Sequence, residues 1–263
     1  MIAKCCNKDA PATMQSKLEK YHASEREMAR TQDLLSLLPQ GRESVLDIGA
    51  RDGHFARLLS ERFAEVTALD LQRPRFEIPN VVTVEGDVTN LQFASESFDC
   101  VFCAEVLEHV LEIQKACREI ARVAKYEVLI GVPFKQDTRL GRCRCHGCGN
   151  VNPPWGHVNT FDLKKLIELF PKLDLISVSF VGSTRETTNR VSVFLMDLAG
   201  NPWGTYEQEE PCIHCGTKMN PPGERPVWQR GLSHLAAQID RVQAACVAPH
   251  ANWVHALFSQ RGD

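Results

Sequence analysis

Short apolar runs alternate with amphipathic stretches along most of this chain. Near-continuous hydrophobic runs bounded by turn residues occupy positions 44–48, 66–69, 81–84, 98–104 and 127–132. Between several of these runs, residues 55–63 and 110–124 repeat apolar side chains at helical spacing. Apolar strands separated by amphipathic helices are typical of a parallel sheet that helices cover on both faces. The pattern therefore predicts an α/β fold with a mostly parallel sheet.

The region after residue 160 is expected to complete this sheet. A helix predicted over 162–170 precedes two further apolar runs, at 173–181 and 191–198. With these two runs the sheet has seven strands. Because only the short link 182–189 joins the two runs, they are predicted to form an antiparallel pair.

Composition narrows the class of protein. The chain has 263 residues, 43% of them hydrophobic, and a formal net charge of −3, which argues against binding phosphates over a large surface. No apolar run approaches the roughly 20 residues of a membrane span. Residues 1–8 lack the apolar core of a secretory signal, so we expect a cytoplasmic protein. In a reducing cytosol, eleven cysteines favour metal or redox chemistry over a disulfide framework.

A glycine turn follows the first predicted strand. In Asp47-Ile-Gly49-Ala-Arg-Asp-Gly53, Gly49 permits a ligand to approach the backbone and Gly53 lets the turn tuck under the next helix. A nicotinamide-binding turn would have Gly-x-Gly-x-x-Gly at this point. Here a carboxylate, Asp47, stands at the strand end, which suits a ligand with an ammonium group and repels a pyrophosphate.

This segment resembles the first motif of class I S-adenosylmethionine-dependent methyltransferases, and matches continue in order over roughly residues 42–170. The resemblance implies a Rossmann-like sheet of seven strands with helices on both faces. It also implies cofactor contacts from Asp70 and Leu71 after the second strand, where the family binds the ribose hydroxyls. Asp87 and Val88 follow the third strand, where the family contacts the adenine. Glu105 ends the fourth strand, which opens on the methyl donor. Arg51 stands where the family often has a second glycine.

The sequence Glu105-Val-Leu-Glu108-His109 offers a second group of polar side chains. If a helical turn begins at Glu105, all three lie on one side, and two carboxylates with an imidazole suit Mg²⁺ or a similar divalent ion. The pattern is similar to one in ubiquinone-biosynthesis O-methyltransferases and small-RNA 2′-O-methyltransferases, where these residues hold such an ion. Relatives without a known metal carry it too, and there the residues cap a helix and brace a loop.

His157, in Gly-His-Val-Asn-Thr-Phe, lies where the family borders its substrate pocket. A neutral imidazole can take a proton from a hydroxyl or an amine, so His157 is a candidate general base. The alternative is that His157 orders its loop while Thr160 or Asp162 caps the next helix.

Two Cys-x-x-Cys-Gly knuckles occur in predicted loops. Their four cysteines, Cys145, Cys148, Cys212 and Cys215, supply the ligands of a closed tetrahedral Zn²⁺ site, which is structural because no position remains for water or substrate. Cys143 is a less favoured fourth ligand. Such a zinc site pins the loop beside the active site to the C-terminal part of the chain.

We therefore divide the chain into three parts. They are an N-terminal helical cap at 1–41, with a helix over 14–38 that folds over the cofactor; a methyltransferase domain at 42–199, with a knuckle insert at 135–156; and a C-terminal part at 200–263, with the second knuckle, a helix over 227–246 and a final apolar run at 253–258.

The expected function is methyl transfer from S-adenosylmethionine to a small or medium-sized acceptor, with a hydroxyl favoured. His157, Glu105 and His109 are the candidate catalytic residues. Just before the first knuckle, a basic cluster of Lys135, Arg139, Arg142 and Arg144 suits an anionic acceptor, or forms a solvated loop. Two alternatives stay open: an RNA methyltransferase, and a non-catalytic partner protein that uses the zinc module for binding. The sequence does not indicate an oligomeric state.

Overall fold

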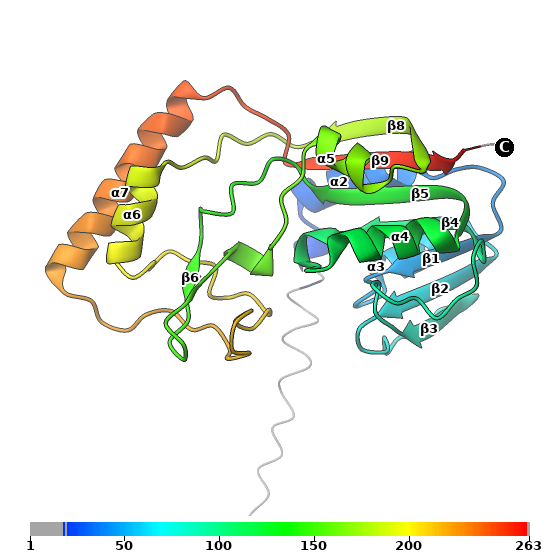
Figure 1. Ribbon diagram of the computed structural model, residues 1–263, viewed down its shortest axis with the longest axis horizontal. Coiled ribbons are helices and arrows are strands. Elements are labelled where there is room, and N and C mark those ends of the chain that lie inside the picture. The colour runs from blue at the N-terminus through cyan, green and yellow to red at the C-terminus, as the bar shows by residue number, and fades with distance from the viewer. Residues whose placement is uncertain (1–17, 19, 262–263) are drawn as a thin grey trace, which may run out of the picture.

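A seven-stranded sheet with helices on both faces organises the molecule (Figure 1). The structure is a computed structural model and describes residues 18 and 20–261. The strand order is β3-β2-β1-β4-β5-β9-β8. Strands β1 to β5 run parallel to one another, and β9 pairs antiparallel with both β5 and β8. The predicted fold class is confirmed.

The five parallel strands form where the apolar runs predicted them. They are β1 (Ser44–Ile48), β2 (Glu65–Asp70), β3 (Val81–Glu85), β4 (Phe98–Ala104) and β5 (Ala124–Pro133). Helices α4 (Ile113–Val123) and α5 (Leu163–Leu169) pack on one face. Helices α2 (Glu25–Leu37) and α3 (His54–Ser60) cover the other face. Because the central strands are buried on both sides, each carries a mostly apolar run, with few polar residues such as Asp47 and Asp99.

The last two strands differ from the prediction. Strand β8 (Leu173–Val181) forms as expected, but residues 191–198 form a helix, α6 (Arg190–Leu198). The side chain of Asn189 caps this helix by accepting from the backbone N–H groups of Val191 and Ser192. The antiparallel partner of β8 is the final apolar run, β9 (Trp253–Gln260). The predicted methyltransferase domain ended at residue 199, but the sheet also includes β9, which lies after that boundary.

The N-terminal helix also differs from the prediction. A continuous helix over 14–38 is wrong in its described part, because residues 23–24 form a turn and a new helix, α2, begins at Glu25. The Ser24 side chain caps α2 by accepting from the Glu27 N–H. Residues 14–17 and 19 lie outside the described residues.

The segments between β5 and β9 hold the remaining elements. They include the short strands β6 (Cys143–Arg144) and β7 (Val151–Asn152), the 3-10 helix η2 (Pro154–Gly156) and helix α7 (Val227–Cys246); a further 3-10 helix, η1 (Leu107–His109), follows β4. Helix α7 has the predicted bounds and packs beside α6, away from the sheet (Figure 1). No helix in the described part of the chain is long and apolar enough to cross a membrane.

Candidate functional site

The carboxyl ends of the parallel strands bring the predicted cofactor residues to one edge of the sheet. Gly49 follows β1, Asp70 ends β2, Asp87 follows β3 and Glu105 follows β4. These four strands are neighbours in the sheet, so the residues that end them line a single edge. Ligands of open α/β sheets bind at this edge.

Both glycines of the turn are required by its geometry. Gly49 and Gly53 have φ angles of +82° and +81°, in the left-handed region that favours glycine. A Cβ on Gly49 would lie 2.3 Å from Val106 Cγ2, and one on Gly53 would lie 2.7 Å from the Phe76 ring. Gly53 is also the N-cap of α3. A larger residue at either position would strain the backbone and clash with a neighbouring side chain. The two glycines therefore keep the backbone of the turn accessible to a ligand.

Asp47 is a buried carboxylate beneath this turn. It is 2% exposed, and its Oδ2 has no hydrogen-bond partner among the described residues. Burial, with Asp70 and Asp52 nearby, raises the pKa of Asp47 to about 7. An unpartnered buried carboxylate at this position fits a cationic group of a ligand, which the sequence predicted from the residue type alone.

Asp70 and Asp87 are held by backbone N–H groups. Asp70 accepts from the N–H of Arg51 at 2.9 Å and from that of Leu71 at 2.7 Å, while Leu71 exposes its side chain at 70%. The Asp87 carboxylate accepts from the Thr89 N–H at 2.8 Å. Val88, by contrast, is buried in the core, at 7% exposure. The Asp70 carboxylate is thus fixed beside an exposed apolar side chain, as a nucleoside site requires.

Glu105 does not begin a helical turn. It has a φ of +59°, and the helical residues that follow form η1, which starts at Leu107. Its carboxylate turns toward helix α2, where Arg30 lies 3.3 Å away. Arg30 is buried and also donates to Glu27, with Nε to Oε2 at 2.9 Å. The expected alignment of Glu105 with Glu108 and His109 is wrong in this respect.

Glu108 and His109 instead meet His157. The ligand atoms of these three residues all lie within 4.8 Å of one another. Glu108 is fully buried, and neither carboxylate oxygen has a hydrogen-bond partner among the described residues. Burial, reinforced by Glu105, raises the pKa of Glu108 well above its usual value. A buried carboxylate without partners costs stability unless it is protonated or binds a cation.

His157 is oriented by a neighbouring amide. Its Nδ1 lies 2.6 Å from Gln136 Oε1, so Nε2 is the ring nitrogen without this partner. The His109 and His157 rings meet edge to face, with centroids 4.7 Å apart. Burial, together with His109, lowers the pKa of His157 to about 3, so the imidazole is neutral at pH 7. Asp162 caps α5 as expected, by accepting from the Lys165 N–H.

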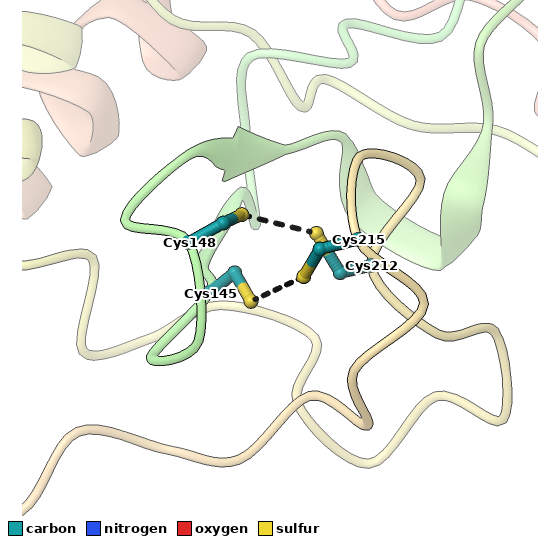
Figure 2. Close-up of side chains that lie close together, drawn as sticks. All are labelled: Cys145, Cys148, Cys212 and Cys215. Carbon is teal, nitrogen blue, oxygen red and sulfur yellow. Dashed lines mark hydrogen bonds between the residues drawn. The ribbon is translucent and has the colours of Figure 1, made fainter.

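The four knuckle cysteines converge (Figure 2). Cys145 Sγ lies 3.6 Å from Cys215 Sγ, and Cys148 Sγ lies 3.6 Å from Cys212 Sγ. These separations exclude disulfides, in which the sulfurs are about 2.0 Å apart. A tetrahedral zinc with Zn–S bonds of about 2.3 Å holds its sulfurs about 3.8 Å apart, so the four thiols fit that ion.

Cys143 lies apart from this cluster of four. It is fully buried, and its Sγ contacts Thr205 Oγ1 at 3.6 Å. Cys100, Cys103 and Cys117 are buried in the core of the sheet region. Cys5 and Cys6 lie outside the described residues.

Residues 207–210, just before the second knuckle, connect the insert to the cofactor edge. Glu209 pairs with Arg51 of the glycine turn at 2.5 Å. Gln208 accepts from the Trp155 N–H at 2.8 Å, and a Cβ on Gly156 would lie 3.1 Å from Glu210. The segment therefore contacts both the glycine turn and the loop that carries His157.

Most side chains of the basic cluster bind other groups of this chain. Arg139 pairs with Asp137 at 2.7 Å, and Arg142 makes two bonds of 2.8 Å to Asp197. Arg144 donates to the carbonyl of Gly149. Neither Lys135 nor Arg144 makes an ion pair among the described residues.

Several residues of the site carried little sequence signal. Arg30 stands three residues after Glu27, which follows the capping Ser24 at the same interval, and this spacing marks a helix start. Gln136 and Glu210 lie in irregular loops, where no periodicity indicates which side chains turn inward. The N-terminal segment does reach the glycine turn, since His22 Nε2 lies 2.9 Å from Asp52 Oδ2.

Residues 46–130 match a family model described as a methyltransferase domain. This part of the chain is thus similar to methyltransferase domains. The match runs from within β1 to most of β5 and includes every cofactor-edge residue described above.

Known proteins are also similar to part of this chain. The uncharacterized methyltransferase YcgJ of Bacillus subtilis is 29% identical over 126 residues, which are 43% of this chain and 50% of YcgJ. The ubiquinone biosynthesis O-methyltransferase of Albidiferax ferrireducens is 30% identical over 100 residues, covering 34% of this chain and 40% of that protein. The chain thus spans half or less of the length of these curated relatives.

Solved structures share the fold of this chain. The YcgJ crystal structure aligns with a TM-score of 0.55 and 17% identity, over 90% of this chain and 99% of YcgJ. A chain from the complex between the Haloferax volcanii Trm112 methyltransferase activator and a methyltransferase aligns with a TM-score of 0.54 and 13% identity, over 97% of this chain and 96% of that chain.

Proposed function

We propose that this protein transfers the methyl group of S-adenosylmethionine to a hydroxyl of a small or medium-sized acceptor. The observation that carries the proposal is the cofactor edge inside the matched domain. There Gly49, Asp70 and Asp87 end or follow neighbouring parallel strands, with the unpartnered Asp47 beneath them.

Each part of the donor has a matching group at this edge. The ribose hydroxyls would donate to Asp70, and the adenine would lie against the exposed Leu71, near Asp87. The ammonium group would approach the buried charge of Asp47. The buried Arg30, whose Nη1 lies 3.3 Å from Glu105 at the end of β4, would offer a cation to the donor carboxylate.

The reaction needs alignment more than it needs chemical groups. The sulfonium makes the methyl carbon electrophilic; the acceptor oxygen attacks that carbon, the carbon–sulfur bond breaks, and S-adenosylhomocysteine leaves. A dry pocket that holds the two reactants in line supplies most of the rate increase. The acceptor oxygen must also lose its proton.

We place this proton transfer at the cluster of Glu108, His109 and His157. An imidazole with a pKa of about 3 is a weak base for a hydroxyl, because an efficient base has a pKa near the working pH. Neutral imidazoles and a buried carboxylate do suit a divalent cation such as Mg²⁺ or Mn²⁺. Such an ion would supply Lewis acidity that lowers the pKa of the acceptor hydroxyl. Glu105 belongs to the Arg30 side of the site in this arrangement.

The knuckle cysteines would hold one structural Zn²⁺ per chain. Its role would be to fix the insert against the glycine turn and the His157 loop, through residues 207–210. Metal analysis of the purified protein tests this: about one equivalent of zinc is expected, and less than half an equivalent would contradict the site.

Donor binding tests the proposed function directly. Asp70→Ala should weaken S-adenosylmethionine binding by about 100-fold in calorimetry, since it removes an ionised acceptor of two hydrogen bonds. Asp99→Ala is the matched control, because Asp99 also accepts from two backbone N–H groups, those of Glu43 and Ser44, at the opposite edge of the sheet. Equal donor affinity of the two variants would contradict the proposal.

A labelled methyl donor offered to metabolite and RNA fractions then identifies the acceptor. Label in the RNA fraction, with binding that falls steeply with salt, would favour the RNA alternative. A zinc-loaded protein that does not bind the donor would favour the partner-protein alternative.

A further inference from the structure

Helices α6 and α7 share an apolar face that the rest of the described chain leaves uncovered. Six side chains make up this face, each between 44% and 66% exposed: Val191, Phe194 and Leu198 on α6, and Trp228, Leu235 and Val242 on α7. An exposed group of this kind, with two aromatic side chains, marks a contact surface in soluble proteins. We call it the hairpin face.

The six side chains lie on the same side of the helix pair. The helices run antiparallel, since Asn189 at the start of α6 bonds Gln243 near the end of α7, and Gln229 near the start of α7 bonds the Leu198 carbonyl. Each residue advances about 100° around a helix. We call the line along which the two helices contact each other the seam. In an antiparallel pair, the residue just before each seam residue therefore points to the same side of the pair.

The exposed apolar residues occupy those positions. On α6, Val191 precedes the buried Ser192 and Leu198 precedes the buried Ala199. On α7, Leu235 precedes the buried Ala236. Trp228 and Val242 likewise precede Gln229 and Gln243, the two glutamines that bond across the seam. The hairpin face is therefore one continuous surface on two helices.

The spacing on each helix is that of helix-on-helix packing. The α7 residues recur every seven positions, and Gly231, Gln238 and Ala245 lie three positions after each of them. The α6 residues recur at intervals of three and four. Of these three, Gly231 and Ala245 are small, and large residues next to small ones form the knobs and holes of a bundle.

The charges of the two helices argue against a lipid surface. Helix α7 carries two arginines, one aspartate and no lysine in 20 residues, whereas helices that lie on membranes have a strongly basic polar face. The six side chains expose on the order of 600 Å², and a stable dimer buries about 800 Å² per partner. Polar residues at the rim of the face would supply the remainder.

We propose that the hairpin face is the interface of a two-fold symmetric dimer, in which α6 and α7 of two copies form a four-helix bundle. An isologous contact uses the same patch on both copies, so a single apolar face suffices to bury itself. The interface lies away from the cofactor edge, and the proposal therefore stands independently of the proposed function.

Light scattering coupled to size exclusion tests the proposal on the full, zinc-loaded chain. At protein concentrations of about 10–100 µM, the expected mass is twice the 29.5 kDa of one chain. The double variant Trp228→Ser, Leu235→Ser should raise the dimer dissociation constant by about 100-fold or more. The matched control is Val82→Ser with Leu111→Ser, which removes two apolar side chains, 61% and 78% exposed, from outside the face.

Three outcomes would overturn the proposal. The first is a wild-type protein of single-chain mass throughout this range, and the second is equal dimerisation of the two double variants. The third is a monomer that binds vesicles of phosphatidylglycerol and phosphatidylcholine through these residues, which would assign the face to lipid. Unchanged helical circular dichroism and zinc content show that a variant is folded, and unchanged donor affinity separates the result from the methyltransferase proposal.

Discussion

The sheet and the inserted segments, residues 134–156 and 182–252, are held together by different means. The largest core cluster of the sheet contains 24 buried residues from strands and helices on one face alone. The core of the knuckle region contains five: Cys143, Cys145, Tyr206, Cys212 and Met219. So small an apolar core cannot offset the entropy of ordering its loops, and regions of this kind depend on cross-links or metals. Two of the five core residues, Cys145 and Cys212, are proposed zinc ligands, which connects the packing of the insert directly to the proposed zinc.

Removal of the zinc ligands should separate the two regions most strongly. Structural zinc sites contribute about 10–16 kcal/mol of apparent binding energy, so the double variant Cys148→Ser, Cys212→Ser should lose zinc and unfold the knuckles. Hydrogen exchange should accelerate in residues 134–156 and 200–225 and stay slow in β1, β4 and β5. Cys246→Ser, at an exposed cysteine outside the cluster, should change nothing. Equal loss of protection in the sheet would show that the regions are not independent.

Glu108 lies where the two regions meet, and its replacement should act in opposite directions with and without a divalent ion. Glu108→Gln should stabilise the metal-free protein by about 1–3 kcal/mol, because it replaces a buried ionisable group that lacks partners. The same change should abolish stabilisation by Mn²⁺ in thermal unfolding. Glu112→Gln, at a carboxylate 68% exposed, is the control. If Mn²⁺ stabilises Glu108→Gln and Glu112→Gln equally, the proposed ion does not bind at Glu108.

The pH dependence of donor binding should report on the sheet region alone. Because the pKa of Asp47 is raised to about 7, donor affinity should rise about tenfold between pH 6 and pH 8 as the carboxylate ionises. The contribution of Asp47 to folding stability runs the other way: it is fully present below the ordinary pKa of 3.8 and is lost as the pH rises through about 7. Calorimetry at the two pH values checks the affinity, and Asp47→Asn should flatten it.

The smallest effect is expected at the start of α2. Ser24→Ala removes the cap of this helix and should lower the free energy of unfolding in urea by about 1 kcal/mol. Ser36→Ala, which removes an exposed hydroxyl near the end of the same helix, should be neutral within about 0.5 kcal/mol. If Ser24→Ala lowers only the unfolding free energy of the sheet region, the two regions unfold separately.

The same contrast explains what the sequence could predict. Strands β1 to β5 carry continuous apolar runs between turns, and their order along the chain is also the order of the cofactor residues. Residues 191–198 form an apolar run of strand length as well, and periodicity cannot distinguish such a run from a helix. The cap Asn189 was the local signal for the helix. The pairing of β8 with β9 depends on a strand over 70 residues later, which no local pattern indicates.

The candidate site divides in a similar way. Gly49, Gly53 and Asp70 are dictated by backbone geometry next to a strand, so residue type and position were sufficient. Glu105 was misplaced because a left-handed backbone at a non-glycine residue leaves no mark in the sequence. The approach of His157 to Glu108 joins segments about 50 residues apart, and depends on packing that only the folded chain shows.

The position of β9 in the sheet has a consequence for synthesis. Strand β9 covers the edge of β5, yet about 120 residues separate Pro133 from Trp253. At about 5–20 residues per second, the edge of β5 waits roughly 6–24 seconds on the ribosome before its partner emerges. An uncovered apolar edge strand is a template for aggregation. The insert must therefore form, or be sheltered by a chaperone, while the sheet that it interrupts is still open.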